Sequence, residues 1–224
     1  MPESSSPRRL PRGRYALSRE EVDRIQRSRL CSAMADVMVQ KGYVATSVED
    51  VLKRAQVSRQ TFYQLFDSKL DCFMATFDFA AKLLLERILA TIGAGVDGEP
   101  GLGGKGDPLG RFEQAITSYL EALAAEWPYT RLFLVEVYAA GPDAIMRRTE
   151  LQETLITVLA DLLEVTDEVG RFTCQVIIAA TSTMVTKPVA ENDPSALPEL
   201  GPPLIDHVRR LWAAGAFGEQ PAPS

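Results

Sequence analysis

Three long polar side chains lie close together near residue 60. Arg59, Gln60 and Gln64 carry hydrogen-bond donors and acceptors, at spacings that place them near the exposed N-terminal half of one short helix. In the major groove of DNA, an arginine can pair with guanine O6 and N7, and a glutamine with adenine N6 and N7. The pattern therefore favours a base-reading role for these three residues.

Hydroxyl groups and a charge flank these three side chains. Such groups at helix starts suit contacts with phosphate oxygens, alongside the free backbone N–H groups of the helix. Contacts of this kind fix the register of a protein on DNA and do not read its sequence. The candidates are Thr46, Ser47, Ser58, Thr61, Tyr63 and Lys69.

The elements that must position these residues are predicted from helix caps and apolar spacing. Capping signals predict helices at about 18–42, 47–55 and 58–65, the first ended by a glycine. A long helix followed by two short ones across a tight turn is typical of a helix-turn-helix module, whose second short helix enters the major groove. The expected core of this module is Val51, Leu52, Ala55, Val57, Phe62 and Phe66.

The rest of the chain also has helical periodicity. No convincing alternating strand pattern occurs, so the predicted fold class is all-α with about nine helices in total. A stretch with eight glycines between Gly93 and Gly110 predicts a flexible loop. The further helices are expected at 68–92, 107–127, 128–139, 142–163, 167–187 and 203–214.

Charge is divided unevenly along the 224 residues. The net charge is −6, but residues 1–70 hold 13 basic and 8 acidic residues, a net of +5, which leaves −11 for residues 71–224. This asymmetry favours a polyanion as the partner of the N-terminal third, although chance clustering gives the same numbers.

Several function classes are made improbable by composition. The three cysteines are far apart, and His207 is the single histidine, so metal sites and histidine-based catalysis are not expected. We expect buried thiols, no catalytic residues and no cofactor. The longest apolar run, Val176–Ala180, is far short of a membrane span, which needs about 20 residues. With no export signal, the cytoplasm is the expected location.

The segment from Gly42 to Lys69, GYVATSVEDVLKRAQVSRQTFYQLFDSK, resembles the N-terminal domain of the TetR family of bacterial transcription regulators. The resemblance extends over residues 18–70 and rests on matches to the family pattern. It implies that Arg59, Gln60 and Gln64 face bases and that Thr61, Tyr63 and Lys69 face the DNA backbone. The matches are Gly42-Tyr43, Thr46-Ser47-Val48, Val51-Leu52, Ala55, Val57-Ser58, Thr61-Phe62-Tyr63, Phe66 and Ser68-Lys69.

One position departs from that pattern. Gln56 stands at the turn where the family usually has glycine. Either this glutamine takes a positive φ at a cost of about 1 kcal/mol, or the turn shifts slightly.

Composition and the resemblance together predict four regions. A basic arm at 1–17, expected to be disordered, either adds DNA contacts or only solubilises the chain. A helix-turn-helix domain follows at 18–67, then a ligand-binding and dimerisation domain at 68–216, and a disordered tail at 217–224. Large or adaptable side chains on the helices that surround a pocket in the family are candidates for ligand contact. They are Phe77, Leu84, Tyr119, Trp127, Phe133, Glu136, Tyr138, Met146 and Met184.

Glu136 is the one acid in a strongly apolar run. It is expected to be buried, where it either pairs with Arg147 or Arg148 or contacts a polar group of a ligand.

The last two predicted helices carry apolar stripes on more than one side. One stripe can face the protein's own core and another a partner, and the family resemblance implies a four-helix interface in a homodimer. The residues expected there are Phe172, Val176, Ile177, Ala180, Leu204, Val208, Leu211 and Trp212.

The function implied by the resemblance is sequence-specific regulation of transcription. We expect a homodimer on a palindromic double-stranded DNA operator, and we favour a repressor released by a small apolar or amphipathic effector over an activator. Two other classes stay open at this stage. One is a helical adaptor without DNA binding, and the other is an all-α enzyme acting on an apolar ligand.

Overall fold

The computed structural model describes residues 18–93 and 107–218. The regular elements within these ranges are helices, so the all-α prediction is confirmed. The expected arm at 1–17 and most of the glycine-rich stretch lie outside the described residues. The N-terminal helices are α1 (Arg19–Ala45), α2 (Val48–Ala55), α3 (Arg59–Leu65) and α4 (Lys69–Gly93). The others are α5 (Pro108–Ala125), α6 (Trp127–Arg131), the π-helical segment η1 (Leu132–Glu136), α7 (Val137–Ala140), α8 (Pro142–Leu162), α9 (Glu168–Ala190), α10 (Ala196–Glu199) and α11 (Gly201–Ala213).

The first three helices are each started by a serine. Ser18 and Ser47 form capping boxes, and the Ser58 hydroxyl accepts a hydrogen bond from the Thr61 backbone N–H, as the sequence predicts. Gly42 interrupts the helical backbone of α1 with φ 75°, and one further turn follows to Ala45. The helix-turn-helix therefore begins directly after a kink.

The turn between α2 and α3 has one of the two backbone conformations that the sequence left open. Gln56 adopts a left-handed conformation, with φ 55° and ψ 46°, and its N–H bonds the Leu52 carbonyl. The first of the two expectations for this position is therefore confirmed. A glutamine holds a conformation that glycine adopts without steric cost.

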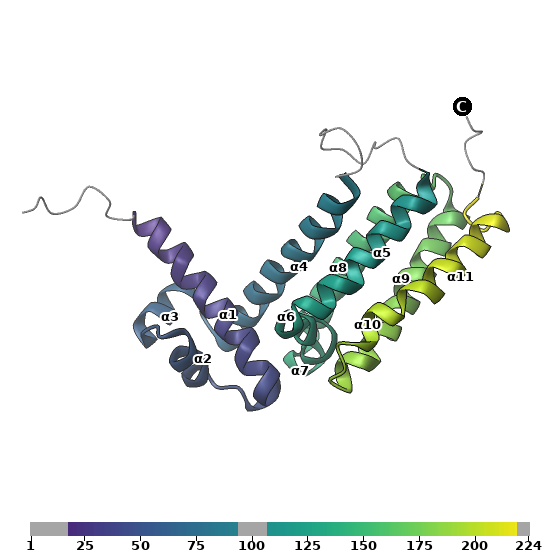
Figure 1. Cartoon of the computed structure of the whole chain (residues 1–224). Helices are drawn as coiled ribbons and strands as arrows, with labels where there is room; N and C mark the ends of the chain where they lie inside the picture. Colours follow the sequence, from purple (N-terminus) through teal and green to yellow (C-terminus); the bar gives the residue numbers. More distant parts are fainter. Residues whose placement is uncertain (1–17, 94–106, 219–224) are drawn as a thin grey trace, which may run out of the picture.

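The remaining helices form a bundle beside the helix-turn-helix (Figure 1). Helices α4, α5, α8, α9 and α11 run alongside one another, while α6 and α7 lie at the end of the bundle nearest the end of α1. Helix α4 connects the two parts, because it follows α3 directly and also packs on α5. A displacement of α4 would therefore move the helix-turn-helix.

Besides the extra turn after Gly42, the structure differs from the predicted helices in three further places. The single helix expected at 128–139 is divided into α6, η1 and α7. Helix α9 continues through Pro188 to Ala190, although a proline lacks the N–H that would pair with the carbonyl four residues earlier. Helix α10 and the start of α11 occupy part of the segment expected to be irregular at 188–202.

A continuous apolar core extends from the helix-turn-helix into the bundle. Phe62, Phe66, Phe73 and Phe77 are its largest fully buried side chains. Phe217, expected in a disordered tail, is buried and packs against Trp212 with ring centroids 5.7 Å apart.

The three cysteines are buried free thiols, as expected. Burial raises the pKa of all three, to about 11 for Cys174. Over the described ranges, no helix is both long and apolar enough to cross a bilayer.

Candidate DNA-binding surface and ligand cavity

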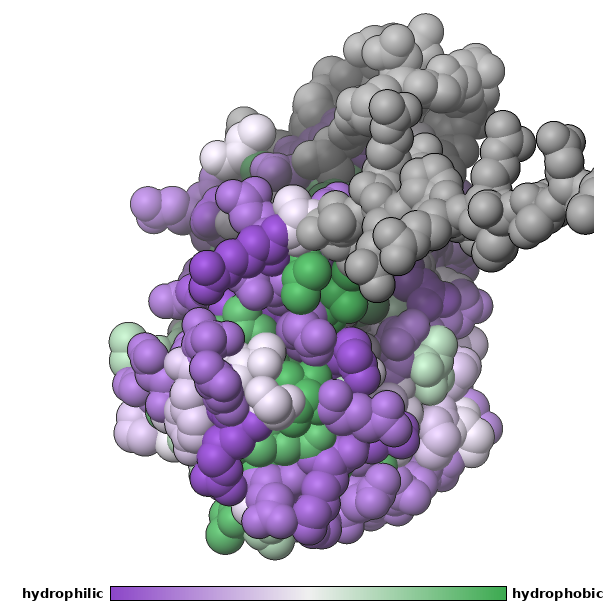
Figure 2. Space-filling model, turned by 90° about the vertical axis from the view of Figure 1, so that its left-hand side faces the viewer, coloured by the Kyte–Doolittle hydropathy of each residue, from purple (hydrophilic) through white to green (hydrophobic). Residues whose placement is uncertain are grey.

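Helix α3 presents its polar residues to solvent. Arg59, Gln60, Tyr63 and Gln64 are exposed, whereas Phe62 on the opposite side is fully buried. Figure 2 looks at the side of the molecule where α1 to α3 lie, and hydrophilic residues cover most of its coloured surface. The candidate base-reading side chains thus share one open face.

Two arginines of α1 hold the ends of the short helices. Arg29 donates to the Ala55 carbonyl at the end of α2, at 2.6 Å. Arg27 donates to the Leu65 carbonyl at the end of α3, at 3.2 Å, and its guanidinium lies 4.5 Å from the Phe66 ring centroid. Cations at helix C-termini also interact favourably with the helix dipoles, so both short helices are fixed against α1.

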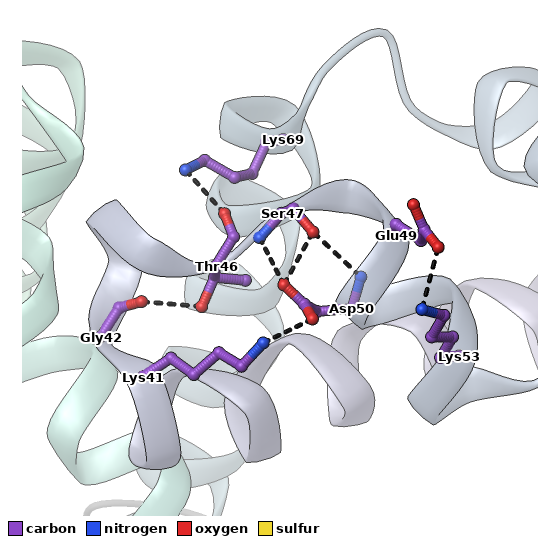
Figure 3. A network of polar contacts seen from close by, with 8 residues as sticks. All are labelled: Lys41, Gly42, Thr46, Ser47, Glu49, Asp50, Lys53 and Lys69. Carbon is purple, nitrogen blue, oxygen red and sulfur yellow. Dashed lines mark hydrogen bonds and ion pairs between the residues drawn. The ribbon is translucent and has the colours of Figure 1, made fainter.

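A polar network closes the start of α2 (Figure 3). The Asp50 carboxylate accepts bonds from the Ser47 N–H, the Ser47 hydroxyl and the Lys41 ammonium, the last at 2.5 Å. These donors, the Lys41 ammonium foremost, lower the pKa of Asp50 well below its usual range. Ser47 remains exposed, while Thr46 is buried and its hydroxyl donates to the Gly42 carbonyl at 2.7 Å.

Lys69 faces the protein in this structure (Figure 3). Its ammonium donates to the carbonyls of Tyr43 and Thr46, at 2.9 and 3.0 Å, and lies 4.1 Å from the Tyr43 ring centroid. Burial lowers its pKa. Lys69 thus ties the first turn of α4 to the end of α1, and a phosphate contact would require it to exchange these bonds.

An apolar cavity of about 90 Å³ lies within the bundle. It is lined by side chains from α4, α5, α8 and α9, among them Ile88, Phe112, Leu155, Leu159 and Ile177. Its wall is overwhelmingly apolar, which suits a hydrophobic ligand.

A few polar groups also line the cavity. Tyr119, Gln152 and Ser182 line it, and the Ser182 hydroxyl accepts a bond from Arg148 at 2.6 Å. Burial raises the pKa of Tyr119 to about 12, so its phenol is a neutral hydrogen-bonding group at physiological pH. The cavity can therefore offer polar partners to one end of an otherwise apolar molecule.

The structure distributes the predicted ligand residues among several places. Tyr119 lines the cavity, whereas Leu84 and Phe133 line a second cavity of about 20 Å³, and Phe77 stacks edge-on against Phe133. The indole of Trp127 donates to Asn192. The remaining apolar candidates are exposed, and they are Tyr138, Met146 and Met184.

Sequence reasoning missed most residues that line the cavity. Phe112, Ile116 and Tyr119 follow a helical repeat on α5, and Gln152, Leu155 and Leu159 do so on α8. This repeat is a usable signal for the inward faces of both helices.

Glu136 is buried, as expected, but its partners differ from the expected ones. Its carboxylate accepts a bond from the backbone N–H of Tyr43 at 2.7 Å and lies 3.5 Å from an Arg131 nitrogen. Arg147 pairs instead with Asp78 and Glu150, and Arg148 with Ser182. Glu136 does not line the apolar cavity.

Helices α9 and α11 form an apolar groove of about 530 Å³. Phe172 and Val176 are 65% and 50% exposed, which is unusual for large apolar side chains. Seven of the eight predicted dimer residues line this groove, and Trp212 packs beside it on Phe217. The exposed apolar groove resembles one half of an interface.

A polar, exposed helix on a small capped module, joined by α4 to a hollow helical bundle, is the arrangement expected of a DNA-binding regulatory protein. Comparison with known proteins agrees for the N-terminal region. Residues 30–76 match the family model of bacterial regulatory proteins, tetR family. The resemblance to the TetR family found in the sequence is therefore confirmed.

The relatives are transcriptional regulators. The chain is 25% identical over 138 residues to the HTH-type transcriptional activator FasR of Mycolicibacterium smegmatis, covering 62% of this chain and 58% of that protein. The matched part thus spans less than two thirds of the curated relative. These similarities support a regulator and do not favour an enzyme.

Solved structures share the fold. The fatty acid degradation regulator FadR from Bacillus halodurans superposes with a TM-score of 0.68 at 17% identity, covering 86% of this chain and 95% of that one. FadR from Bacillus subtilis, in complex with stearoyl-CoA, gives a TM-score of 0.64 at 17% identity, covering 80% and 95%.

Proposed function

We propose that this protein is a cytoplasmic transcriptional regulator whose homodimer binds a palindromic operator and is released by an amphipathic effector. The observation that carries the proposal is the position of α4. This helix bears Lys69 at the helix-turn-helix and Ile88 on the cavity wall. A ligand that alters the bundle can therefore shift the recognition helices through one rigid element.

Base reading is assigned to Arg59, Gln60 and Gln64. Their exposure on one face of α3 supports this role, as does the absence of acidic residues from the first turn of that helix. Phosphate contacts are assigned to Thr46, Ser47, Ser58, Thr61, Tyr63 and Lys69, among which Thr46 and Lys69 would need local rearrangement.

The effector is proposed to be a molecule with a long apolar part and a polar end. The apolar wall supports the first property, and the Tyr119, Ser182 and Arg148 cluster supports the second. A structural neighbour binds stearoyl-CoA, so long-chain acyl thioesters are the first compounds to test. Ligand pockets usually measure about 300–1,000 Å³, so a cavity of about 90 Å³ must widen to admit such a chain.

Helices α9 and α11 are proposed to form the dimer interface. One recognition helix reads only a few base pairs, whereas two placed about 34–36 Å apart read both halves of a palindrome. Phe172→Glu should turn the dimer into a monomer in analytical ultracentrifugation and weaken operator binding. Phe79→Glu, an equally charged change at an exposed phenylalanine of α4, should leave the dimer intact. A dimeric Phe172→Glu protein would place the interface elsewhere.

Operator binding is tested by selecting genomic fragments with the purified protein, then titrating the best site at two salt concentrations. We expect a palindromic site and a steep salt dependence. Arg59→Ala should lower discrimination between correct and altered sites by about 1–3 kcal/mol. Lys82→Ala, which removes one exposed charge from α4, is the matched control. Failure to enrich any sequence would overturn the proposal, and enrichment unchanged by Arg59→Ala would overturn the base-reading assignment.

Release is tested by adding stearoyl-CoA to the protein–operator complex, with free coenzyme A as the control for the polar end. Coupling between effector and operator is typically about 1–3 kcal/mol, which corresponds to a several-fold to hundredfold loss of affinity. Transcription in vitro from a template carrying the site then decides between repression, which we propose, and activation.

A further inference from the structure

The end of α1 is joined to the bundle by a buried carboxylate. Glu136 Oε2 accepts a hydrogen bond from the Tyr43 backbone N–H at 2.7 Å, across 93 positions of sequence. Glu136 is only 6% exposed. A charge-assisted bond in such surroundings is stronger than an ordinary backbone hydrogen bond.

Gly42 makes this approach possible. Its φ of 75° turns the backbone out of the helix, which directs the next N–H toward the bundle. A side chain at this position would place its Cβ 3.3 Å from Glu136 Oε2, closer than most real contacts. The bond from Tyr43 to Glu136 therefore depends on the kink at Gly42 and on the absence of a side chain there.

Arg131 continues the contact into the bundle. One of its nitrogens lies 3.5 Å from Glu136 Oε1, and another donates to the Val189 carbonyl of α9 at 3.2 Å. Arg131 and Glu136 are five residues apart across the π-helical segment η1, in which backbone pairing also spans five residues. Glu136 is thereby linked to α9, a helix that also lines the cavity.

The residues held by this contact lead directly into the helix-turn-helix. Lys69 binds the carbonyls of Tyr43 and Thr46, and Glu136 binds the Tyr43 N–H. Thr46 is followed by Ser47, the cap of α2. The orientation of α2 and α3 relative to the bundle thus depends on how this short segment is held.

We propose that Glu136 is a positioning residue for DNA binding, which holds the helix-turn-helix at the angle that operator binding requires. The contact keeps the end of α1 in one arrangement before DNA is met, so less orientational freedom is lost on binding. Through Arg131 and α9, the same carboxylate links the cavity wall to the DNA-binding module. This inference rests on the proposed function and names a residue outside the DNA contacts.

The decisive variant is Glu136→Ala, measured on the operator selected by the wild-type protein. Without this bond the end of α1 samples several arrangements, and selecting the competent one on binding should weaken operator affinity by up to about tenfold. The dependence of affinity on salt should stay unchanged, because no phosphate contact is removed. Hydrogen exchange of the amides at 42–47 should become faster.

Two further variants separate positioning from simple stability. Glu136→Gln keeps an oxygen that can accept the Tyr43 N–H, so its operator affinity should lie between those of wild type and Glu136→Ala. Thr130→Val removes a different buried hydrogen bond of the same region, the one from Thr130 to the Leu123 carbonyl. It should lower the melting temperature without weakening operator binding at temperatures where the protein is folded.

The outcomes are distinguishable. Operator binding by Glu136→Ala that is unchanged or tighter overturns this inference and leaves the proposed function intact. Equal weakening by Thr130→Val also overturns it, since the effect would then be general destabilisation. If the wild-type protein selects no operator, the proposed function fails and this inference fails with it.

Discussion

The helix-turn-helix and the helical bundle are held together by different kinds of contact. In the former, each short helix is capped by its own serine, and Lys41, Ser47 and Asp50 close a network within ten residues. In the latter, the cavity is enclosed by four helices whose lining residues span Ile88 to Ser182. Local chemistry defines the recognition surface, whereas long-range packing defines the ligand site.

The two regions also differ in how fully they are packed. Phe62 is fully buried and contacts both Tyr63 and Phe66, at centroid distances of 5.3 and 5.6 Å. Ile116 lies against the cavity. A small module needs a full core to hold a fixed surface, while a ligand-responsive bundle needs space that can widen.

The largest effect is therefore expected in the small module. Phe62→Ala should destabilise it by about 3–5 kcal/mol, because a large side chain is removed from a filled site. Ile116→Ala should cost about 2 kcal/mol, because one side of Ile116 already faces empty space. Denaturant unfolding followed by circular dichroism measures both. Equal costs would show that the two regions are packed alike.

Filling the cavity tests the bundle side of the comparison. Ala115→Leu adds apolar atoms at the cavity wall, and each buried CH₂ contributes about 0.8 kcal/mol if it fits without strain. We expect a higher melting temperature, intact operator binding and a weaker response to stearoyl-CoA. Isothermal titration and operator release measure the last effect. A full response in a stabilised variant would mean that the effector binds elsewhere.

The turn of the recognition module offers a smaller, stabilising change. Gln56 has φ 55°, which costs a non-glycine residue about 1 kcal/mol. Gln56→Gly should remove that strain but add chain entropy to the unfolded state, for a net gain of a few tenths of a kcal/mol, up to about 0.5 kcal/mol. Gln56→Ala keeps the strain and serves as the control. A less stable glycine variant would mean that the glutamine side chain stabilises the turn.

The same difference between local and long-range contacts explains which features could be predicted from the sequence. Caps and turn residues act over three or four positions, so the helix starts at Ser18, Ser47 and Ser58 were predicted correctly, and the positive φ at Gln56 was one of the two alternatives that the sequence left open. Periodicity located the long helices. It could not show that residues 132–136 form a π-helical segment, because apolar spacing over five residues does not distinguish π-helical from α-helical pairing.

Cavity residues were mostly missed for a related reason. An apolar residue on an inward face either fills space or borders it, and the difference depends on helices distant in sequence. Phe133 and Tyr119 have the same apolar and aromatic character in the sequence, but only Tyr119 reaches the cavity of about 90 Å³. Burial of Glu136 was predicted from its apolar neighbours, but its partner is a backbone N–H, which no residue type reveals.

The smallest expected effect concerns acid stability of the recognition module. The Lys41 ammonium and the Ser47 donors lower the pKa of Asp50 in the folded protein. A carboxylate with a lowered pKa contributes stability that is fully present above its unfolded pKa of about 4, and that is lost as the pH falls below this value. The difference in unfolding free energy between wild type and Asp50→Asn should thus be constant from about pH 8 to 5 and shrink below about pH 4.

The partner variant makes the test specific to this ion pair. Lys41→Met removes the largest cause of the lowered pKa, so its stability difference from wild type should narrow over the same acidic range. Both differences in unfolding free energy should also shrink at high salt, because the Lys41 side chain is 46% exposed and its charge is therefore screened by ions. If both differences stay constant down to pH 3, Asp50 acts only as a hydrogen-bonding cap, and the module owes its order at this end to the Ser47 cap rather than to charge.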